Sequence, residues 1–415
     1  MVQASIITIG DELLIGQVID TNSAWMAQEL NKWGIRVKRR VAVGDVWEEI
    51  WNALDEEQQQ ADIILITGGL GPTADDITKP LLCKYFGGTM VENAGARQNV
   101  IDIFTRLNRP IIERNLKQCE VPDVCTVIQN KRGTAPGMWF NKNGKIFVSM
   151  PGVPHEMKGM ITDDVIPMLL KQFQFPSIVH RTLLTAGVGE SFLAERIKDF
   201  EEGLPPYVKL AYLPNYGMVR LRLTAMGDEQ AKTEQEVQQL FETLQALVKE
   251  YMVTNEDEPI EKTVGRLLLP KGKTMCTAES CTGGFIAHLI TSMPGSSVFY
   301  KGTVVSYANE VKKDVLGVEQ STLETEGAVS EEVVKQMAKG ALRHLKTDYA
   351  IAVSGIMGPD GGSEEKPVGT VWMAVASNSN VETQKLSFRY DRMRNIQMTA
   401  VNSLNMLRKF IIAGN

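Results

Sequence analysis

Asp62-Ile63-Ile64-Leu65-Ile66-Thr67 is the stretch that decides the fold of the N-terminal part of this chain. Its apolar residues follow one another without the alternation typical of a strand that has one face in water. A strand of this kind is covered on both faces, as in a parallel sheet flanked by helices. The segment therefore predicts a layered α/β domain, and the glycine-rich stretch Gly68–Asp76 would lie at the carboxyl edge of its sheet.

The same pattern of apolar strand and amphipathic helix extends from residue 1 to residue 172. Strands are expected at Ser5–Ile9, Val37–Val43 and Lys145–Met150. Helices are expected at 20–34, 46–57 and 157–173. This βαβ succession, with right-handed crossovers, predicts a doubly wound α/β domain over residues 1–172.

Two further regions follow. Residues 173–254 have the order strand, helix, strand, strand, helix, which predicts a small α+β module. The acidic segment Asn255–Pro259 indicates a linker, because it combines like charges with a proline. From residue 259 to 415 the α/β pattern resumes, and Ser330 is the expected N-cap of a helix whose first turn carries Glu331 and Glu332.

Composition excludes several classes of protein. The chain has 415 residues, of which 43% are hydrophobic, and 44 basic against 50 acidic residues leave a net charge of −6. That balance argues against a nucleic-acid binder and a membrane partner. The N-terminus lacks a secretory signal, and five cysteines without a CxxC pair favour a reducing cytoplasm.

The segment Thr277–Gly284 (TAESCTGG) leaves a predicted strand and opens a helix. The first N–H groups of a helix lack intrahelical partners, so they can bind an oxyanion or a phosphate. Ser280 is therefore our candidate nucleophile for attack on a carbonyl, with Thr282, Gly283 and Gly284 in the binding loop. The alternative is that Ser280 and Thr282 only cap the helix.

A serine nucleophile needs a proton acceptor, and Lys312 is the candidate. It is expected in the first turn of the helix that follows Tyr307. A helix N-terminus disfavours an ammonium, which would lower the pKa of Lys312 and suit it to accept a proton. Tyr307 would relay the proton or hold the leaving group. The alternative is that Lys312 pairs with Glu310 or Asp314 on a solvated helix face.

The third segment of interest, Ser354–Gly362, is rich in glycine and follows a predicted strand. Glycines let backbone amides approach an anion closely, and Arg392, beyond a later strand, could bind a phosphate with two hydrogen bonds. The candidate substrate-binding residues of this region are Ser354, Gly355, Gly358, Gly361, Gly362 and Arg392. The alternative is a loop without a ligand.

In the N-terminal domain, three loops follow three strands of the predicted sheet: Gly10–Glu12, Gly68–Asp76 and Pro151–Met157. Their glycines could cradle a phosphate, and their carboxylates offer oxygen ligands for Mg²⁺. The candidate nucleotide-binding residues of these loops are Asp11, Glu12, Gly68, Gly69, Gly71, Thr73, Pro151 and Gly152. The alternative is turn chemistry, with Asp75 and Asp76 capping a helix and Asp11 closing a turn.

Together, AESCTGG, SYANEVK and SGIMGPDGG resemble the CinA family over residues 259–415. The resemblance implies a deamidase that converts nicotinamide mononucleotide to nicotinic acid mononucleotide and ammonia without a cofactor. It implies that Ser280 is the nucleophile, assisted by Tyr307 and Lys312. Met357 and Tyr390 depart from the alanine and glycine that the family commonly has there.

TGGLGPTADD and PGVPHEM resemble the molybdopterin-binding fold in the version found in CinA proteins. The resemblance implies a metal-dependent ADP-ribose pyrophosphatase that yields AMP and ribose 5-phosphate. Asp75, Asp76 and Glu156 would hold Mg²⁺, Mn²⁺ or Co²⁺, and Lys79 would neutralise phosphate charge. Binding of a pterin or nucleotide without turnover stays open.

The middle module resembles the KH-like segment of CinA proteins, but Gly187–Glu190 is not the GxxG of a nucleic-acid clamp. We therefore expect no nucleic-acid partner and a scaffold or homodimer role. The expected protein is a bifunctional hydrolase of pyridine-nucleotide salvage. The rival is a non-catalytic adaptor in competence or DNA repair.

Overall fold

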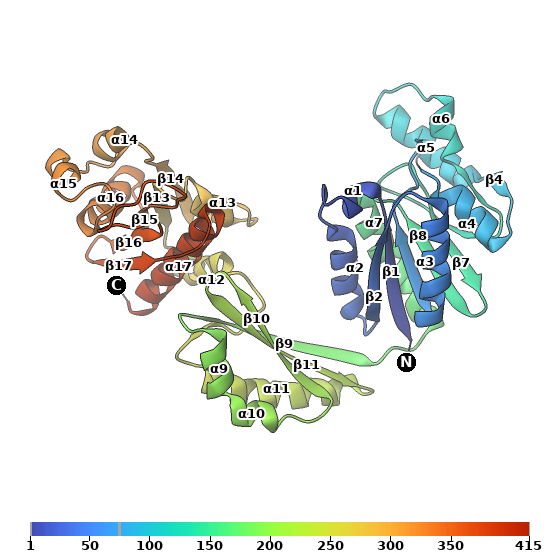
Figure 1. The fold of residues 1–415 in the computed structure, drawn as a ribbon, viewed down its shortest axis with the longest axis horizontal. Coiled ribbons are helices and arrows are strands. Elements are labelled where there is room, and N and C mark those ends of the chain that lie inside the picture. The colour runs from blue at the N-terminus through green and yellow to red at the C-terminus, as the bar shows by residue number, and fades with distance from the viewer. Residues whose placement is uncertain (1, 74–75, 415) are drawn as a thin grey trace. The chain divides into compact units, whose positions relative to one another are not determined.

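The computed structural model describes residues 2–73 and 76–414 and divides into two compact units (Figure 1). The first comprises residues 1–178 with 226–233, and the second comprises 179–225 with 234–415. Each unit is described by itself.

The first unit is built on a six-stranded sheet of order β2-β1-β3-β8-β7-β6. Four strands are parallel: β1 (Gln3–Ile9), β2 (Arg36–Val43), β3 (Ile63–Thr67) and β8 (Lys145–Met150). β7 (Gly137–Lys142) pairs antiparallel with β8, and the edge strand β6 (Thr126–Ile128) pairs antiparallel with β7. The predicted α/β fold class is confirmed, and the carboxyl ends of β1, β3 and β8 meet at one edge.

Successive side chains of β3 enter different cores, which explains its unbroken apolar sequence. Ile63 and Leu65 pack with α2 (Thr21–Asn31), α7 (Pro154–Met160) and α8 (Ile166–Gln172). Ile64 and Ile66 pack on the opposite face with α3 (Trp47–Gln60) and α4 (Thr78–Phe86). The sheet is thus covered by helices on both sides, as the sequence predicts.

Two features of this unit differ from the sequence prediction. The helix expected over 157–173 is broken by a π-helical turn, Ile161–Val165, between α7 and α8. Residues 87–125, for which no elements were predicted, form further elements. These are β4 (Met90–Glu92), α5 (Ala94–Arg106), α6 (Glu113–Lys117) and β5 (Glu120–Pro122). The short helix α1 (Asp11–Leu14) near the N-terminus was not predicted either.

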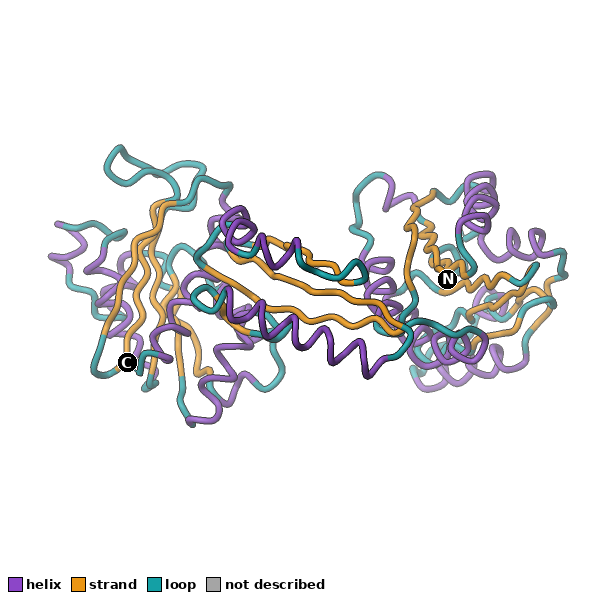
Figure 2. The backbone as a smooth tube through the Cα atoms, turned by 90° about the horizontal axis from the view of Figure 1, so that it is seen from below, coloured by secondary structure: helices purple, strands orange, loops and turns teal. Residues whose placement is uncertain are grey.

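The middle module has a four-stranded sheet of order β10-β11-β9-β12. Its strands are β9 (Ser177–Ala186), β10 (Val208–Asn215), β11 (Met218–Gly227) and β12 (Met252–Thr254). The helices are α9 (Glu190–Arg196), α10 (Lys198–Glu202) and α11 (Gln230–Leu247). Figure 2 shows the long helix α11 running alongside the strands, which agrees with the predicted α+β module.

The C-terminal part has a five-stranded sheet of order β14-β13-β15-β16-β17. Its strands are β13 (Met275–Glu279), β14 (Tyr300–Val305), β15 (Tyr349–Gly355), β16 (Thr370–Ser377) and β17 (Val381–Ser387). The first three in the sheet order are parallel and the last two pair antiparallel. The carboxyl ends of β13, β14 and β15 therefore lie side by side.

The two faces of this sheet differ in side-chain size. Alanines and Cys276 cover the face against α16 (Glu331–Leu345). Larger residues such as Met275 and Ile351 face α12 (Ile260–Leu268), α13 (Phe285–Thr291) and α17 (Arg392–Ile412). Leu184 and Met218 of the middle module join this second core, so the module and the C-terminal domain share an apolar core.

The two short helices α14 (Asn309–Asp314) and α15 (Gln320–Thr325) precede α16, whose N-cap is Ser330 as predicted. All five cysteines are free thiols. Within the described residues, every helix is too short or too polar to cross a membrane.

Candidate functional site

The loops after β13, β14 and β15 surround a cavity of about 260 Å³. Ser280 comes from the first loop, Tyr307 and Lys312 from the second with α14, and Ser354 from the end of β15. Arg392 enters from the start of α17. The structure thus gathers residues from all three sequence motifs, together with Gly355 and Gly358, in one cavity.

Ser280 lies at the point where β13 turns toward α13. Its N–H donates to the carbonyl of Val353 (3.0 Å), and its carbonyl accepts from the N–H of Gly283 (3.2 Å). The side chain is nearly buried, with 8% of the residue exposed. The backbone of the candidate nucleophile is therefore held from both sides.

The carboxylate of Glu279 binds the N–H groups at the start of α13, where the sequence predicts that the substrate binds. This fully buried carboxylate accepts from the N–H groups of Gly284 (3.1 Å), Ile286 (3.0 Å) and Ala287 (2.9 Å). It also accepts from the hydroxyl of Thr282 (2.7 Å). An internal anion thus satisfies these donors, as expected at a helix start.

The helix begins at Phe285, after the whole TAESCTGG segment, because Gly283 and Gly284 have φ of 60° and 98°. Thr282, Gly283 and Gly284 do not line the cavity. Within the described residues, the N–H groups of Cys281 and Thr282 donate to no other residue. Of these two residues, Cys281 lines the cavity beside Ser280 and Thr282 does not.

Lys312 is buried, with only 1% exposed. Its Nζ donates to the carbonyls of Ser306 (2.8 Å) and Tyr307 (3.2 Å), and burial lowers its pKa against the opposing effects of Cys281 and Glu310. The alternative of a solvated ion pair is wrong, because Lys312 is buried. Asp314 pairs with the neighbouring Lys313 instead (3.6 Å).

The predicted cause of the lowered pKa also needs correction. Lys312 lies in the last turn of the short helix α14, where a helix dipole favours the ammonium. Desolvation, which disfavours the charged form, is the cause. Within the described residues, no hydrogen bond joins Nζ to the Ser280 hydroxyl, although both residues line the cavity.

Arg392 connects two walls of the cavity. Its Nη1 donates to the carbonyl of Gly358 (2.8 Å), and its Nη2 donates to the hydroxyl of Tyr307 (3.2 Å). A guanidinium has five N–H donors, so it keeps further donors for an anion. Tyr307 itself is 65% exposed and forms the outer side of the cavity.

The loop after β15 is held by buried polar groups. The Ser354 hydroxyl donates to the carbonyl of Ala328 (2.7 Å). The Asn395 amide donates to the carbonyls of Met357 (3.0 Å) and Tyr390 (2.9 Å). Gly361 and Gly362 do not line the cavity.

Sequence reasoning missed several lining residues, among them Cys281, Asn309 and Asp360. Burial raises the pKa of the Cys281 thiol to about 12, so this neighbour of Ser280 is not a thiolate at neutral pH. Asp360 adds a carboxylate to the cavity. Its place in a glycine-rich loop predicted to bind an anion made it easy to overlook.

In the first unit, a cavity of about 440 Å³ lies at the carboxyl ends of β1, β3 and β8. It gathers most of the predicted residues: Glu12, Gly68, Gly69, Gly71, Asp76, Pro151, Gly152 and Glu156. Asp11 instead joins two loops, because its N–H donates to Asp45 and its carboxylate accepts the N–H of Asp45, each at 3.1 Å. Asp45 and Gln118 line the cavity and were not predicted.

A second hollow of about 460 Å³ shares Gly71, Asp76 and Gln118 with this cavity. It contains the predicted Thr73 and Lys79 and adds Arg114 and Lys117. Lys79 is almost buried and donates to the carbonyl of Gln118 (2.6 Å). Burial lowers its pKa to about 8, so Lys79 is a weaker cation than the sequence suggested.

Two of the carboxylates predicted to bind a metal accept hydrogen bonds from the protein. Asp76 accepts the N–H groups of Gly71 and Thr73, both at 2.8 Å, and Glu156 accepts from Asn130 (2.6 Å). Asp75 lies outside the described residues, and among those described no group of three candidate ligands converges. The metal site stays a prediction, and we derive no step through a metal.

The fold and the cavities define a multidomain α/β protein with a molybdopterin-binding-like domain, a KH-like module and a second α/β domain. Comparison with family models supports each part. Residues 5–171 match the probable molybdopterin binding domain, 180–254 the damage-inducible protein CinA KH domain, and 257–411 the CinA C-terminal domain.

Relatives match over nearly the full length. The chain is 47% identical over 408 residues to a CinA-like protein of Cytophaga hutchinsonii, covering 98% of each chain. It is 44% identical to one of Flavobacterium psychrophilum, covering 99% of each. The chain belongs to the CinA family.

Among solved structures, the competence/damage inducible protein of Agrobacterium tumefaciens is 42% identical. The match covers 36% of this chain and 93% of the Agrobacterium chain, with a TM-score of 0.35.

Proposed function

We propose that the C-terminal cavity deamidates nicotinamide mononucleotide. One observation carries this proposal: a buried lysine with a lowered pKa lines the same cavity as the buried Ser280. A neutral amine can accept a proton, and a serine hydroxyl needs such an acceptor to become a nucleophile.

The reaction follows from these two groups. The Ser280 Oγ attacks the carboxamide carbon while its proton passes to the neutral Nζ of Lys312. The C–N bond then breaks, and Lys312 returns the proton to the leaving nitrogen, which departs as ammonia. Water attacks the resulting ester with Lys312 again as base, which restores Ser280 and releases nicotinic acid mononucleotide.

Other groups of the cavity suit the substrate. The backbone N–H of Cys281, which lines the cavity beside Ser280, can stabilise the negative oxygen that forms during attack. Arg392 keeps N–H donors for a phosphate, and Asp360 provides a negative charge for the positively charged pyridine ring. Binding energy from phosphate and ring would orient the carboxamide.

Ammonia release from nicotinamide mononucleotide by the full-length protein tests the proposal. We expect turnover by the wild type and its loss in Ser280→Ala. Ser292→Ala is the matched control, because Ser292 is exposed at the end of α13 and lies outside the cavity. A silent wild type, or equal turnover in Ser280→Ala, contradicts the deamidase.

We propose as a second activity that the first unit cleaves the pyrophosphate of ADP-ribose. It rests on two adjoining hollows, one lined by carboxylates and the other by Lys79, Arg114 and Lys117 beside Asp76, Glu113 and Glu120. Formation of AMP from ADP-ribose with and without Mg²⁺, Mn²⁺ or Co²⁺ tests it. Absence of AMP under all conditions would leave a binding domain.

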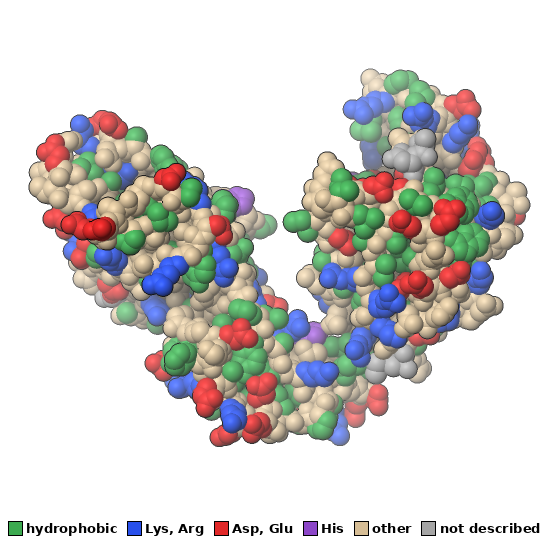
Figure 3. All heavy atoms as spheres, viewed as in Figure 1, with side chains coloured by type: hydrophobic (Ala, Val, Ile, Leu, Met, Phe, Trp, Pro, Cys, Tyr) green, Lys and Arg blue, Asp and Glu red, His purple; other side chains and the backbone are tan. Residues whose placement is uncertain are grey.

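The rival role, an adaptor acting on DNA, lacks support from surface charge. Figure 3 shows acidic side chains interspersed among the basic ones over most of the face in view. A nucleic-acid groove concentrates positive charge. An electrophoretic shift of single-stranded DNA by the full-length protein would favour the adaptor.

A further inference from the structure

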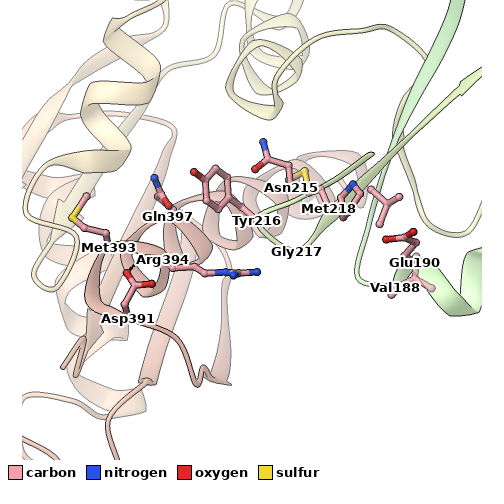
Figure 4. A pocket seen from close by; sticks show the side chains of 13 residues that line it. Val188, Glu190, Asn215, Tyr216, Gly217, Met218, Asp391, Met393, Arg394 and Gln397 are labelled. Atoms are coloured by element: carbon pink, nitrogen blue, oxygen red, sulfur yellow. Dashed lines mark hydrogen bonds between the residues drawn. The ribbon is translucent and has the colours of Figure 1, made fainter. Parts of the chain in front are cut away.

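A groove of about 550 Å³ in the second unit belongs to neither site described above. One wall is the turn between β10 and β11, Pro214–Val219, and a second is the segment Val188–Glu190. The third wall is the start of α17, with Asp391, Met393, Arg394 and Gln397. Figure 4 shows these side chains around the open space between the turn and the helix.

The walls of the groove are held against each other by apolar packing. Met218 and Met398 belong to one core. A Cβ at Gly217 would lie 2.8 Å from Cε of Met398, so the turn approaches α17 closely. The turn residues Tyr216 and Gly217 have φ of 46° and 76°. The groove is therefore a formed feature of this unit.

Arg394 is the cation of the groove. Its guanidinium carbon lies 4.2 Å from the ring centroid of Tyr390, a cation–π contact that covers one face of the group. In Figure 4 the side chain extends from α17 toward the turn and Glu190. Within the described residues no carboxylate lies within 4.0 Å of its nitrogens. Its N–H edge is thus oriented and available for bidentate contact with a phosphate.

The two carboxylates of the groove have different roles. Asp391 accepts the backbone N–H of Arg394 (3.0 Å) and caps α17, so its charge serves the helix start. Glu190 is the first residue of α9 and lines the opposite wall. A carboxylate there can accept hydrogen bonds from the vicinal hydroxyls of a ribose.

The remaining polar groups suit a flat heterocycle. Tyr216 offers an aromatic ring, and Asn215 and Gln397 offer amides that both donate and accept hydrogen bonds. We propose that this groove binds a nucleoside monophosphate, with the phosphate on Arg394, the ribose on Glu190 and the base against Tyr216. The proposal does not depend on deamidase or pyrophosphatase activity.

Isothermal titration of the full-length protein with AMP tests the proposal, with adenosine and inorganic phosphate titrated separately. We expect Arg394→Ala to weaken one class of AMP sites about tenfold or more, since a charge-assisted contact is lost. Arg389→Ala is the matched control, because this exposed arginine of the same segment lines neither the groove nor the Ser280 cavity. It should leave all AMP sites unchanged.

Gln397→Ala supplies a second variant if Arg394→Ala unfolds, and it should weaken AMP but not inorganic phosphate. Unchanged AMP binding in variants that remain folded would overturn the proposal, as would a wild type that binds no AMP. Inorganic phosphate binding as tightly as AMP through Arg394 would overturn the nucleotide class.

Discussion

Arg392 donates a hydrogen bond to the hydroxyl of Tyr307 across 3.2 Å, although 85 residues separate them in the chain. The same guanidinium donates to the carbonyl of Gly358 (2.8 Å). One side chain at the start of α17 therefore connects the loop after β14 with the loop after β15.

Arg392→Ala should raise KM for nicotinamide mononucleotide more than it lowers kcat. The guanidinium is proposed to hold the phosphate, which does not react, so its loss weakens binding by about tenfold to 100-fold. Steady-state ammonia release checks the two constants separately. A loss confined to kcat would contradict phosphate binding by Arg392.

Lys312→Met should reduce kcat by at least about 100-fold, because the substitution removes the proposed proton acceptor while keeping side-chain length. Lys313→Met is its control, since Lys313 is its neighbour and pairs with Asp314.

Burial lowers the pKa of Lys312, and the neutral amine is the active form. The wild-type kcat/KM should therefore rise with pH as Lys312 loses its proton, below the ordinary lysine range. A flat pH profile would argue against Lys312 as base.

Asp360→Asn should raise KM for nicotinamide mononucleotide about tenfold, because the carboxylate faces a positively charged ring in the proposed complex. The reduced mononucleotide has an uncharged ring, and competition by this compound should be unaffected. Glu364→Gln, in the same exposed loop but outside the cavity, is the control. Equal effects on both ligands would rule out recognition of the ring charge.

Glu279→Ala should destabilise the protein by about 2–5 kcal/mol. The variant leaves the N–H groups of Gly284, Ile286 and Ala287 without their buried acceptor. Urea unfolding followed by circular dichroism measures the loss. Glu279→Gln keeps an oxygen acceptor and should lose less, and equal losses would show that a neutral amide oxygen cannot replace the charged carboxylate.

Because of Lys79, the free energy of unfolding of the first unit should change with pH in the alkaline range. Burial lowers the pKa of Lys79 to about 8, against 10.5 for an exposed lysine, so between these values the unfolded chain binds more protons than the folded one. The free energy of unfolding should then rise with pH over this window, by up to about 3 kcal/mol. Urea unfolding of wild type and Lys79→Met at pH 7.5 and 10 checks this, because the variant should lack this part of the increase. Parallel pH dependences would contradict it.

Local pattern in the sequence was enough to predict the sheets and the loops that surround the candidate site. The unbroken apolar run at Ile63–Ile66 requires cover on both faces, and the structure supplies two cores. Ser280, Tyr307 and Lys312 could likewise be placed together, because each follows a strand of one parallel sheet. The short elements at residues 87–125 escaped prediction, since they lack a long apolar period.

Only the tertiary structure decided which hydrogen-bonding groups pair with each other and which ionisable groups are buried away from water. The spacing of residues 279–287 could not show that Glu279 would take the helix N-terminus, because its side-chain direction depends on the surrounding core. The pKa of Lys312 is lowered by burial beneath residues distant in sequence, whereas the sequence suggested a helix dipole. The groove at Arg394 exists only because two segments more than 170 residues apart, the turn at Tyr216 and the start of α17, pack together. Periodicity is local, but burial and pairing are properties of the folded chain.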